Sequence, residues 1–331
     1  MPEKKKILYI VEAMGGGVFT YIVDLANELV DFYDMYIAYA VRKQTPKNYK
    51  DYFDKRVHLI EVKNFERAIN PSKDIAAFFE VKRIANEVKP DIIHLHSSKA
   101  GAIGRMAFNG KIPMFYTPHG YSFLMENYKP IKRRLFKLIE SVCAKRKCTT
   151  ISCSIGEHQK SLKLTKNAIY VNNGINMAEL QEIIDKTEKV NHPFTVYTLG
   201  RICYQKNPTL FNEIASSLPD VKFIWIGDGE LRKELTSKNI EITGWSDRTT
   251  AIKYSVNADA FLLTSRWEGL PISLLESMYM KKVCVVSNVI GNRDVIHTGE
   301  NGFVCSCTDE YVHAIRSAQS NNTDTITESA Y

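Results

Sequence analysis

The sequence predicts an α/β protein made of two doubly wound, Rossmann-like domains that face each other across a cleft. Short apolar runs alternate with longer amphipathic segments along the chain, which is typical of parallel sheets flanked by helices. The 331 residues exceed one ordinary core and suit two domains of about 150 residues each. A composition of 44% hydrophobic and 24% charged residues excludes collagenous, fibrous and disordered chains.

The first domain is expected to span residues 1–178 and to form one parallel sheet. Its apolar runs predict strands, and the amphipathic segments after them predict helices. A turn of three glycines, residues 15–17, follows the first strand. The expected strands are 7–11, 35–41, 57–62, 91–96, 149–154 and 168–174, with a strand and loop over 113–120, and the expected helices are 18–29, 75–88 and one from about residue 99.

A linker over residues 179–193 is expected to lead into the second domain, residues 194–331. The segment 177–192 has no strand pattern and is rich in Glu and Lys, which indicates a short helix and a connection. Ligands of doubly wound sheets bind beyond the carboxyl ends of the strands, so the chemistry is expected in those loops. The strands expected in this domain are 194–201, 221–229, 240–245, 258–265, 282–287 and 302–306.

Cysteines and apolar runs limit the class of protein further. No stretch reaches the roughly 18 uninterrupted apolar residues that a membrane span needs. The seven cysteines are odd in number and scattered, which favours reduced thiols in a cytosol. Cysteine and histidine also lack the spacing of a metal site, so no metal is expected.

Positive charge is concentrated in the first half of the chain. Residues 1–180 carry 29 Lys and Arg against 18 Asp and Glu, whereas the remainder carries 15 against 19. The densest stretch, 129–147, interleaves cations with apolar residues at near-helical spacing, as in a core-packing helix with a solvated basic face or a helix on an anionic membrane. Nucleic acid is not an expected partner, because no recognition motif accompanies the charge. The cations that would meet a membrane are Lys132, Arg133, Arg134 and Lys137.

Two glutamates follow an expected strand of the second domain. Glu268 lies in the loop and Glu276 on the first turns of the next helix, with Gly269, Leu270 and Pro271 between them. Free backbone N–H groups at such a strand-to-helix turn can donate to phosphate or hydroxyl oxygens. Carboxylates beside them can accept from hydroxyls, so the pattern suits a sugar nucleotide. The alternative is a loop carboxylate and a solvent-facing helix residue.

Two cations lie in the loop after the first strand of the second domain. Arg201 and Lys206, within the stretch GRICYQKNP, precede a helix and could neutralise a diphosphate. Each close pair of opposite charges is worth roughly 4 kcal/mol at an effective dielectric constant of about 20. Plain surface charge is the alternative for this pair taken alone.

Four motifs occur in a characteristic order along the two halves. They are YTPHG, YVNNGIN, GRICYQKNP and EGLPISLLE. Together they resemble the retaining glycosyltransferases of family 4, which have the GT-B fold. The resemblance extends from the glycine turn at 15–17 to ENGFV at 300–304.

The resemblance implies roles for residues at matching positions. Arg201 and Lys206 would bind the donor diphosphate and stabilise it as it leaves. Glu276 would hold the ribose hydroxyls, and Glu268 would bind hydroxyls of the transferred sugar. Gly16, Gly17, Gly269 and Leu270 would make further contacts with the sugar donor. His119 would lie near the reaction centre as a catalytic residue, and Lys99 and Asn173 would contact the acceptor.

The resemblance also implies the chemistry. The acceptor oxygen enters from the face that the departing diphosphate leaves, so no protein nucleophile, cofactor or metal is expected. Catalysis would then depend on electrostatic stabilisation of the diphosphate and on positioning of the two substrates. UDP is the nucleotide used most often in the family, and GDP is next.

Two features depart from the family's pattern. The stretch IGNRDVI, residues 290–296, replaces the common G-G-x-x-E motif. The chain ends at Tyr331, where GT-B enzymes commonly continue into a helix that crosses back to the first domain. Either a short natural variant or a missing C-terminus is expected.

The expected function is therefore glycosyl transfer. A cytoplasmic enzyme, at the inner face of the membrane if its acceptor is lipid-linked, would move a sugar from a nucleotide diphosphate to a hydroxyl of a glycan or lipid-linked acceptor. Cell-surface polysaccharide or teichoic-acid biosynthesis is the expected setting. A nucleotide-sugar epimerase of the same fold and a non-catalytic sugar-nucleotide-binding partner subunit are the alternatives. A NAD dehydrogenase is disfavoured, because VEAMGGGVF lacks G-x-G-x-x-G.

Overall fold

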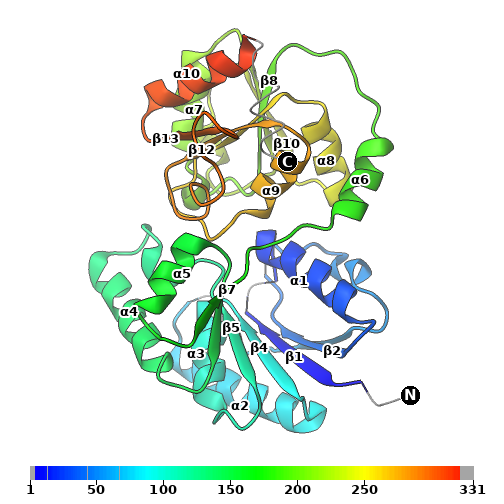
Figure 1. Ribbon diagram of the computed structural model, residues 1–331, viewed down its shortest axis with the longest axis vertical. Coiled ribbons are helices and arrows are strands. Elements are labelled where there is room, and N and C mark those ends of the chain that lie inside the picture. The colour runs from blue at the N-terminus through cyan, green and yellow to red at the C-terminus, as the bar shows by residue number, and fades with distance from the viewer. Residues whose placement is uncertain (1–3, 13, 43, 67, 321–331) are drawn as a thin grey trace. The chain divides into compact units, whose positions relative to one another are not determined.

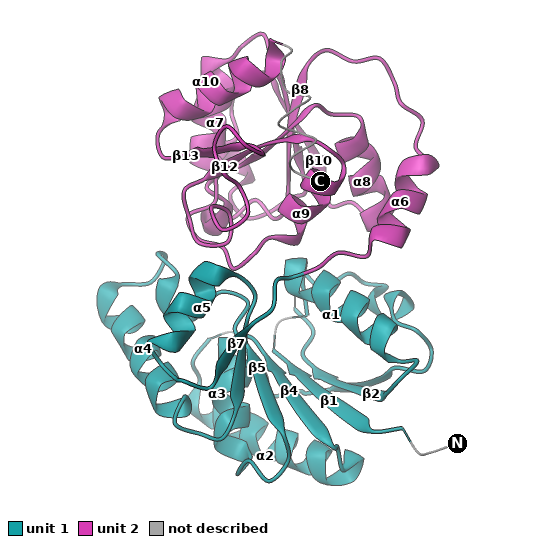
Figure 2. Ribbon diagram, viewed as in Figure 1, with its two compact units in different colours: residues 1–173 teal, residues 174–331 magenta. Residues whose placement is uncertain are grey.

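The computed structural model describes residues 4–12, 14–42, 44–66 and 68–320. The chain divides into two compact units, residues 1–173 and 174–331 (Figure 2). The division lies a few residues before 178, the expected end of the first domain.

The first unit alternates strands and helices along its whole length (Figure 1). Its helices, strands and short 3-10 turns (η) are β1 (Lys6–Val11), α1 (Gly16–Leu29), β2 (Asp34–Tyr39), η1 (Tyr49–Tyr52), β3 (His58–Glu61), α2 (Pro71–Val88), β4 (Ile92–His96), α3 (Ser98–Ala107), β5 (Met114–Thr117), η2 (Ser122–Leu124), α4 (Pro130–Cys143), β6 (Thr149–Ser152), α5 (Ile155–Leu162) and β7 (Ala168–Tyr170). Within its described residues, the strands form one parallel sheet in the order β3-β2-β1-β4-β5-β6-β7. Every strand expected in this half is confirmed.

Two helices begin earlier than expected. α1 begins at Gly16, so Gly16 and Gly17 form its first turn instead of a separate glycine turn. α2 begins at Pro71 because Asn70 caps it: the Asn70 side chain accepts a hydrogen bond from Lys73 N. Proline at the first helical position adds to this start signal, because its φ is already helical.

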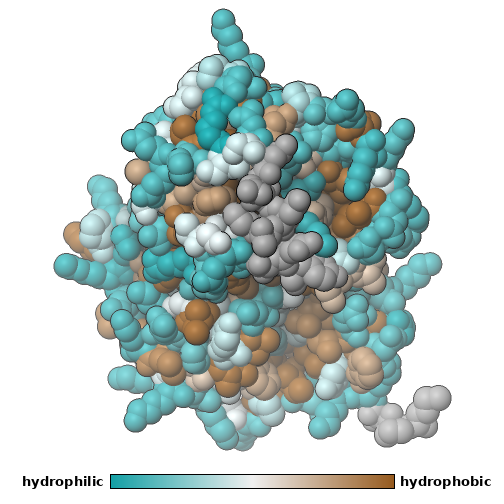
Figure 3. Space-filling model, turned by 45° about the horizontal axis from the view of Figure 1, so that its top comes forward, coloured by the Kyte–Doolittle hydropathy of each residue, from teal (hydrophilic) through white to brown (hydrophobic). Residues whose placement is uncertain are grey.

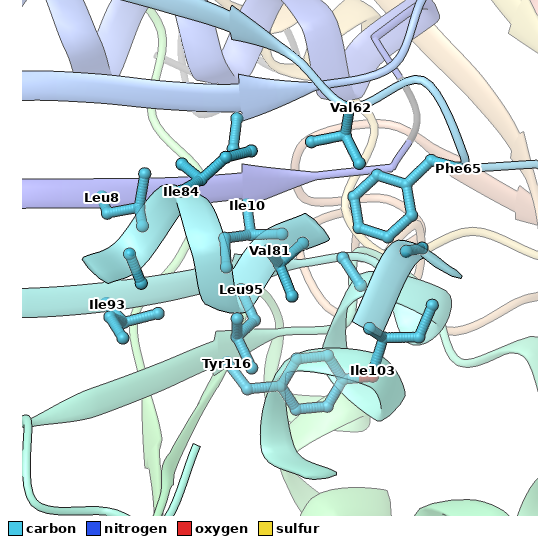
Figure 4. Packing of buried hydrophobic residues seen from close by; sticks show 14 of the residues in the cluster. Leu8, Ile10, Val62, Phe65, Val81, Ile84, Ile93, Leu95, Ile103 and Tyr116 are labelled. Carbon is cyan, nitrogen blue, oxygen red and sulfur yellow. The ribbon is translucent and has the colours of Figure 1, made fainter. Parts of the chain in front are cut away.

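The first sheet is buried on both faces, as a parallel sheet requires. Successive side chains of a strand point to opposite faces. Leu8 and Ile10 of β1 pack with Val81 of α2 and Ile103 of α3 (Figure 4). Tyr9, between them in sequence, packs on the other face with residues of α1. The helices therefore cover both faces and leave the strand ends as the place for polar side chains.

The second unit repeats the same plan with a smaller sheet. Its elements are α6 (Met177–Asp185), β8 (Thr195–Leu199), η3 (Tyr204–Lys206), α7 (Pro208–Ser217), β9 (Lys222–Ile226), η4 (Arg232–Glu234), β10 (Ile240–Gly244), α8 (Arg248–Val256), β11 (Ala260–Leu263), α9 (Ile272–Tyr279), β12 (Val283–Ser287), β13 (Phe303–Cys305) and α10 (Thr308–Gln319). Within its described residues, the parallel strands follow the order β10-β9-β8-β11-β12-β13. The strands expected in this half are also confirmed.

α6 is the short helix expected in the segment 177–192, and it begins two residues before the expected linker, residues 179–193. Its Leu180 is fully buried and packs with Ile252 and Val256 of α8. This small apolar cluster makes α6 part of the second unit, so the chain from 177 to 185 is packed structure.

Both sheets reverse their strand order at one point. The reversal lies between β1 and β4 in the first unit and between β8 and β11 in the second. Doubly wound sheets bind ligands outside the carboxyl ends of the strands at such a switch point. The loops that follow these strands therefore carry the candidate site of each unit.

Candidate functional site

Two loops of the second unit meet at its switch point. Residues 200–207 follow β8, and residues 264–271 follow β11. Arg266 N donates to Gln205 O over 2.8 Å, and Gln205 Nε2 donates to Trp267 O over 3.0 Å. These hydrogen bonds join the two stretches that the sequence singled out as separate motifs.

Lys206 and Glu268 form an ion pair across these loops. Lys206 Nζ lies 2.8 Å from Glu268 Oε1, and Gln205 Nε2 donates to Glu268 Oε2 over 3.3 Å. Both charged side chains are largely buried. A buried charge needs a partner, and here each partner neutralises the other. The structure thus brings together Lys206, which is predicted to bind the diphosphate, and Glu268, which is predicted to bind the sugar.

Arg201 is held more loosely than Lys206. Its Nε lies 3.8 Å from Glu230 Oε2; the Arg201 side chain is half-buried, whereas that of Glu230 is exposed. A pair at this distance and exposure is worth little to stability. The guanidinium of Arg201 is therefore able to reorient toward an anion at small cost.

Gly269 lies against the loop that departs from the family's pattern. Gly291 has φ +86°, and a Cβ there would lie 2.1 Å from Gly269 O, so a side chain at position 291 would displace the loop. The neighbouring Asn292 is buried, and its Nδ2 donates to Ser287 O over 3.2 Å. The stretch IGNRDVI thus supports the backbone around Gly269 and Leu270.

Glu276 lies on α9 and is buried, with 3% of its surface exposed. Its Oε1 accepts a hydrogen bond of 2.5 Å from Arg248 Nη1, and Arg248 Nε lies 3.3 Å from Glu179 Oε1. Burial raises the pKa of Glu276, and the guanidinium of Arg248 lowers it in part. The alternative that Glu276 faces solvent is therefore wrong.

Sequence reasoning missed Arg248. It lies at the start of α8, 28 residues before Glu276, and its local sequence carries no motif. The only signal was indirect, since a carboxylate on a buried helix face requires a cation near it.

The first unit places two glycines at its switch point, after β1. Gly16 and Gly17 are exposed at the start of α1, and Gly16 has φ +60°. The N-cap residue, Gly15, makes no side-chain cap. The first amide groups of a helix lack partners within the helix, so this end can donate to an anion.

His119 follows β5 in the same unit. It has φ +53°, in the left-handed region that non-glycine residues rarely adopt, and Ser97 after β4 has φ +78°. His119 Nε2 lies 3.1 Å from His96 Nδ1, and its ring contacts the edge of Tyr21. Burial lowers the pKa of His119 to about 4. The imidazole is therefore neutral at pH 7.

Three further residues around His119 were not found from the sequence, namely His94, His96 and Glu157. His96 is fully buried, and burial together with His94 and His119 lowers its pKa well below the usual value. Glu157 of α5 is also buried; its carboxylate accepts from Gly120 N over 2.7 Å. The motif HLH in β4 was the available signal for the histidines, because alternate residues of a strand share a face.

The two residues expected to bind the acceptor, Lys99 and Asn173, lie elsewhere in the first unit. Lys99 Nζ lies 2.7 Å from Asp74 Oδ1 and donates to Ala68 O over 2.5 Å. Asn173 N donates to Cys153 O over 3.4 Å, after β7. The ammonium of Lys99 already has two protein partners, and its contact with an acceptor stays a prediction.

The four cations assigned to a membrane lie on α4. Lys132, Arg134 and Lys137 are exposed. Arg133 is half-buried and its Nε donates to Phe123 O over 3.0 Å. Arg133 therefore holds α4 to the loop before it, whereas the other three are available at the surface.

Neither a metal cluster nor a membrane-spanning helix is found in the described part of the chain. No group of three or more His, Cys, Asp or Glu residues there is placed to hold a metal ion. None of the helices with described residues has the length and apolar character to cross a bilayer.

Both units match family models of known proteins. Residues 15–179 match Glycosyltransferase Family 4, and residues 180–329 match Glycosyl transferases group 1. The chain is 30% identical over 292 residues to the UDP-Gal:alpha-D-GlcNAc-diphosphoundecaprenol alpha-1,3-galactosyltransferase of Escherichia coli, a match that covers 78% of this chain and 73% of the relative. The chain belongs to the family 4 type of GT-B glycosyltransferases. The resemblance read from its motifs is confirmed.

Solved structures confirm the fold of this glycosyltransferase. A sucrose-phosphate synthase from Thermosynechococcus elongatus matches with a TM-score of 0.80 at 14% identity, over 99% of this chain and 93% of that one. Anabaena Alr3699/HepE in complex with UDP-glucose matches with a TM-score of 0.76 at 16% identity, over 98% and 92%. At these identities the likeness concerns the fold, which is the predicted GT-B class.

Proposed function

We propose that this glycosyltransferase transfers a hexose or N-acetylhexosamine from a UDP-sugar, with retention of configuration, to a lipid-linked acceptor in cell-surface polysaccharide or teichoic-acid biosynthesis. The observation that carries the proposal is the joined pair of loops at the switch point of the second unit, which holds Arg201, Lys206 and Glu268. The relative from E. coli, named for a UDP-Gal donor and a diphosphoundecaprenol acceptor, supports the choice of substrates. The reaction takes place on the cytoplasmic side, where nucleotide sugars are made.

In this proposal the charged loops act on the leaving diphosphate. The anomeric C–O bond breaks while the acceptor oxygen bonds to the same carbon on the same face, and the acceptor proton passes to the departing phosphate. Arg201 and Lys206 stabilise the charge that grows on that phosphate, so no protein nucleophile, cofactor or metal takes part. Glu268 accepts from hydroxyls of the sugar, and Glu276 from those of the ribose.

The Lys206–Glu268 pair also suggests how the two buried charges are accommodated. Each side chain has the other as its partner at 2.8 Å. A bound diphosphate gives Lys206 a second anion, and sugar hydroxyls give Glu268 new donors. The exchange keeps both charges partnered in both states, which avoids the cost of an unpaired buried charge.

The direct test is ligand-induced thermal stabilisation by UDP, GDP, ADP and NAD. A ligand at 100 times its Kd stabilises the native state by about 2.7 kcal/mol. UDP should raise the Tm of the wild type, whereas Lys206→Met should lose most of that shift because the diphosphate loses its buried cation. Lys222→Met, which removes a lysine from an exposed ion pair with Glu241, is the matched control and should keep the shift.

The same preparations decide between the proposal and its rivals. Stabilisation by NAD alone, or by no nucleotide, would contradict a UDP-sugar site. Conversion of a UDP-sugar to its epimer without an acceptor would identify an epimerase, and binding without turnover on diphosphate-linked acceptors would identify a non-catalytic subunit. The anomeric configuration of the first product, read by NMR, tests retention.

A further inference from the structure

α4 exposes a continuous stripe of large apolar side chains. Ile131 is 80% exposed and Leu138 is 60% exposed, and Leu135 and Val142 are also open to solvent. At about 3.6 residues per turn these four positions fall within an arc of about 60°. On the face drawn in Figure 3, apolar side chains reach the surface in several places between hydrophilic ones. The four on α4 differ because they are aligned along one side of a single helix.

The stripe is separate from the side of α4 that packs against the rest of the unit. The opposite side of α4 carries Glu140, which is buried and accepts from Arg105 Nη2 over 2.6 Å and from Tyr116 Oη over 2.9 Å. Cys143 is buried on that side as well. These contacts fix the rotation of the helix about its axis, so the stripe must face away from the unit.

Positive charge flanks the stripe on both sides. Lys132 lies on one side, with its Nζ 4.2 Å from the ring centre of Tyr128, and Arg134 and Lys137 lie on the other. The acidic residue within α4, Glu140, is buried against Arg105. The exposed surface of the helix therefore combines apolar and cationic side chains without an exposed carboxylate among its described residues.

We propose that α4 is a membrane-docking surface that lies flat on an anionic bilayer. The four apolar side chains enter the boundary between headgroups and acyl chains, while Lys132, Arg134 and Lys137 meet lipid phosphates. The charges favour a bilayer over a second copy of this chain, because two such stripes packed face to face would bring their flanking cations together. The docking surface lies on α4 alone and involves none of the residues assigned to the donor, so it can be disproved while the proposed donor chemistry stands.

Vesicle binding of the full chain tests this surface. We expect the protein to float with vesicles of phosphatidylglycerol and phosphatidylcholine, more weakly at high salt, and poorly with phosphatidylcholine alone. Leu135→Gln with Leu138→Gln should weaken binding by about tenfold or more, because buried methylenes are lost. Arg134→Gln with Lys137→Gln should weaken it by about tenfold and reduce its salt dependence, at about 1 kcal/mol per cation.

The matched control removes exposed apolar side chains from another helix of the same unit. Ile75 and Phe79 of α2 are 60% and 63% exposed, and Ile75→Gln with Phe79→Gln should leave vesicle binding unchanged. All variants should unfold at the wild-type temperature, because the replaced side chains lie at the surface.

Three outcomes would overturn the proposal. Vesicle binding unaffected by both α4 variants is the first, and an equal loss in the α2 control is the second. The third is a dimer in solution that Leu135→Gln with Leu138→Gln dissociates, because the stripe would then be an interface between copies. Transfer to a short water-soluble acceptor should stay at the wild-type rate in the α4 variants, which separates loss of docking from failure of the proposed transferase.

Discussion

At the switch point of the second unit, charged side chains are kept in ion pairs: Lys206 with Glu268, and Arg248 with Glu276. In the first unit, the ends of β4 and β5 carry histidines instead, with Tyr21 of α1 against two of them, and burial favours their neutral forms. The same strand order thus supports two kinds of site. The site of the second unit can exchange a protein partner for a charged ligand, and the histidines of the first unit offer neutral hydrogen-bonding groups.

This difference matters for a transferase. Negative charge develops on the leaving diphosphate, so the groups that stabilise it must be cationic and already in position. A neutral imidazole such as His119 can donate or accept a hydrogen bond without adding a positive charge to the first unit. The paired charges of the second unit are therefore the ones that suit a charged leaving group.

The largest effect on stability is expected from breaking the buried Arg248–Glu276 pair of the second unit. Arg248→Met leaves the carboxylate of Glu276 buried without a guanidinium, and loss of one partner of a buried pair costs about 3–5 kcal/mol. Urea unfolding measures the loss. Arg232→Met, which removes an exposed pair with Asp228, is the control and should cost no more than about 1 kcal/mol.

A double variant separates the charge from the packing in this test. Arg248→Met combined with Glu276→Leu removes both charges, so it should recover most of the lost stability. If Arg248→Met alone costs less than the Arg232→Met control, the ion pair does not have the buried character described here.

Catalysis provides the second test of the paired-charge site. Arg201→Ala should slow transfer by about 10²–10³, because the guanidinium no longer stabilises the leaving diphosphate. The UDP-sugar should still bind. Glu276→Gln should instead weaken nucleotide binding, seen as a raised KM for the UDP-sugar. Arg316→Ala, an exposed cation of α10 paired with Asp220, serves as the control with unchanged kinetics. Wild-type kinetics in both site variants would remove Arg201 and Glu276 from the donor site.

The fold was predictable because its signals are local. β1 was expected at 7–11 and found at Lys6–Val11, since a buried parallel strand is a short apolar run. The two charged loops were predictable for the same reason: GRICYQKNP and EGLPISLLE are continuous stretches at strand ends. The true start of α2 was also predictable, because Asn70 followed by Pro71 is a typical signal for the beginning of a helix.

The partners of the site residues were not predictable in this way. Arg248 reaches Glu276 across 28 residues, and Glu157 supports the loop of His119 through Gly120 N, 37 residues away. Such pairings depend on how helices pack on the sheet, which no local pattern encodes. The exposure of the apolar stripe on α4 is a similar case. Its spacing predicted a helix but left open whether the stripe faced the core or the solvent.

The smallest effect concerns the neutral site of the first unit and its dependence on pH. Burial lowers the pKa of His119 to about 4 and that of His94 to about 3, against about 6.5 in an unfolded chain. Between these values the unfolded state binds more protons than the folded state, so acid favours unfolding. Stability is therefore complete above about pH 6.5 and is lost as the pH falls toward 4.

Urea unfolding of the full chain at pH 7 and pH 5 measures this dependence. His119→Gln should reduce the loss of stability between the two pH values by about 1–2 kcal/mol, because one histidine no longer has to stay neutral in the folded state. His313→Gln, which removes an exposed histidine from α10, should leave the loss unchanged. An equal loss in wild type and His119→Gln would mean that His119 is protonated as readily in the folded unit as in the unfolded chain. The first unit would then carry a titrating cation at its switch point, and the contrast with the paired charges of the second unit would not hold.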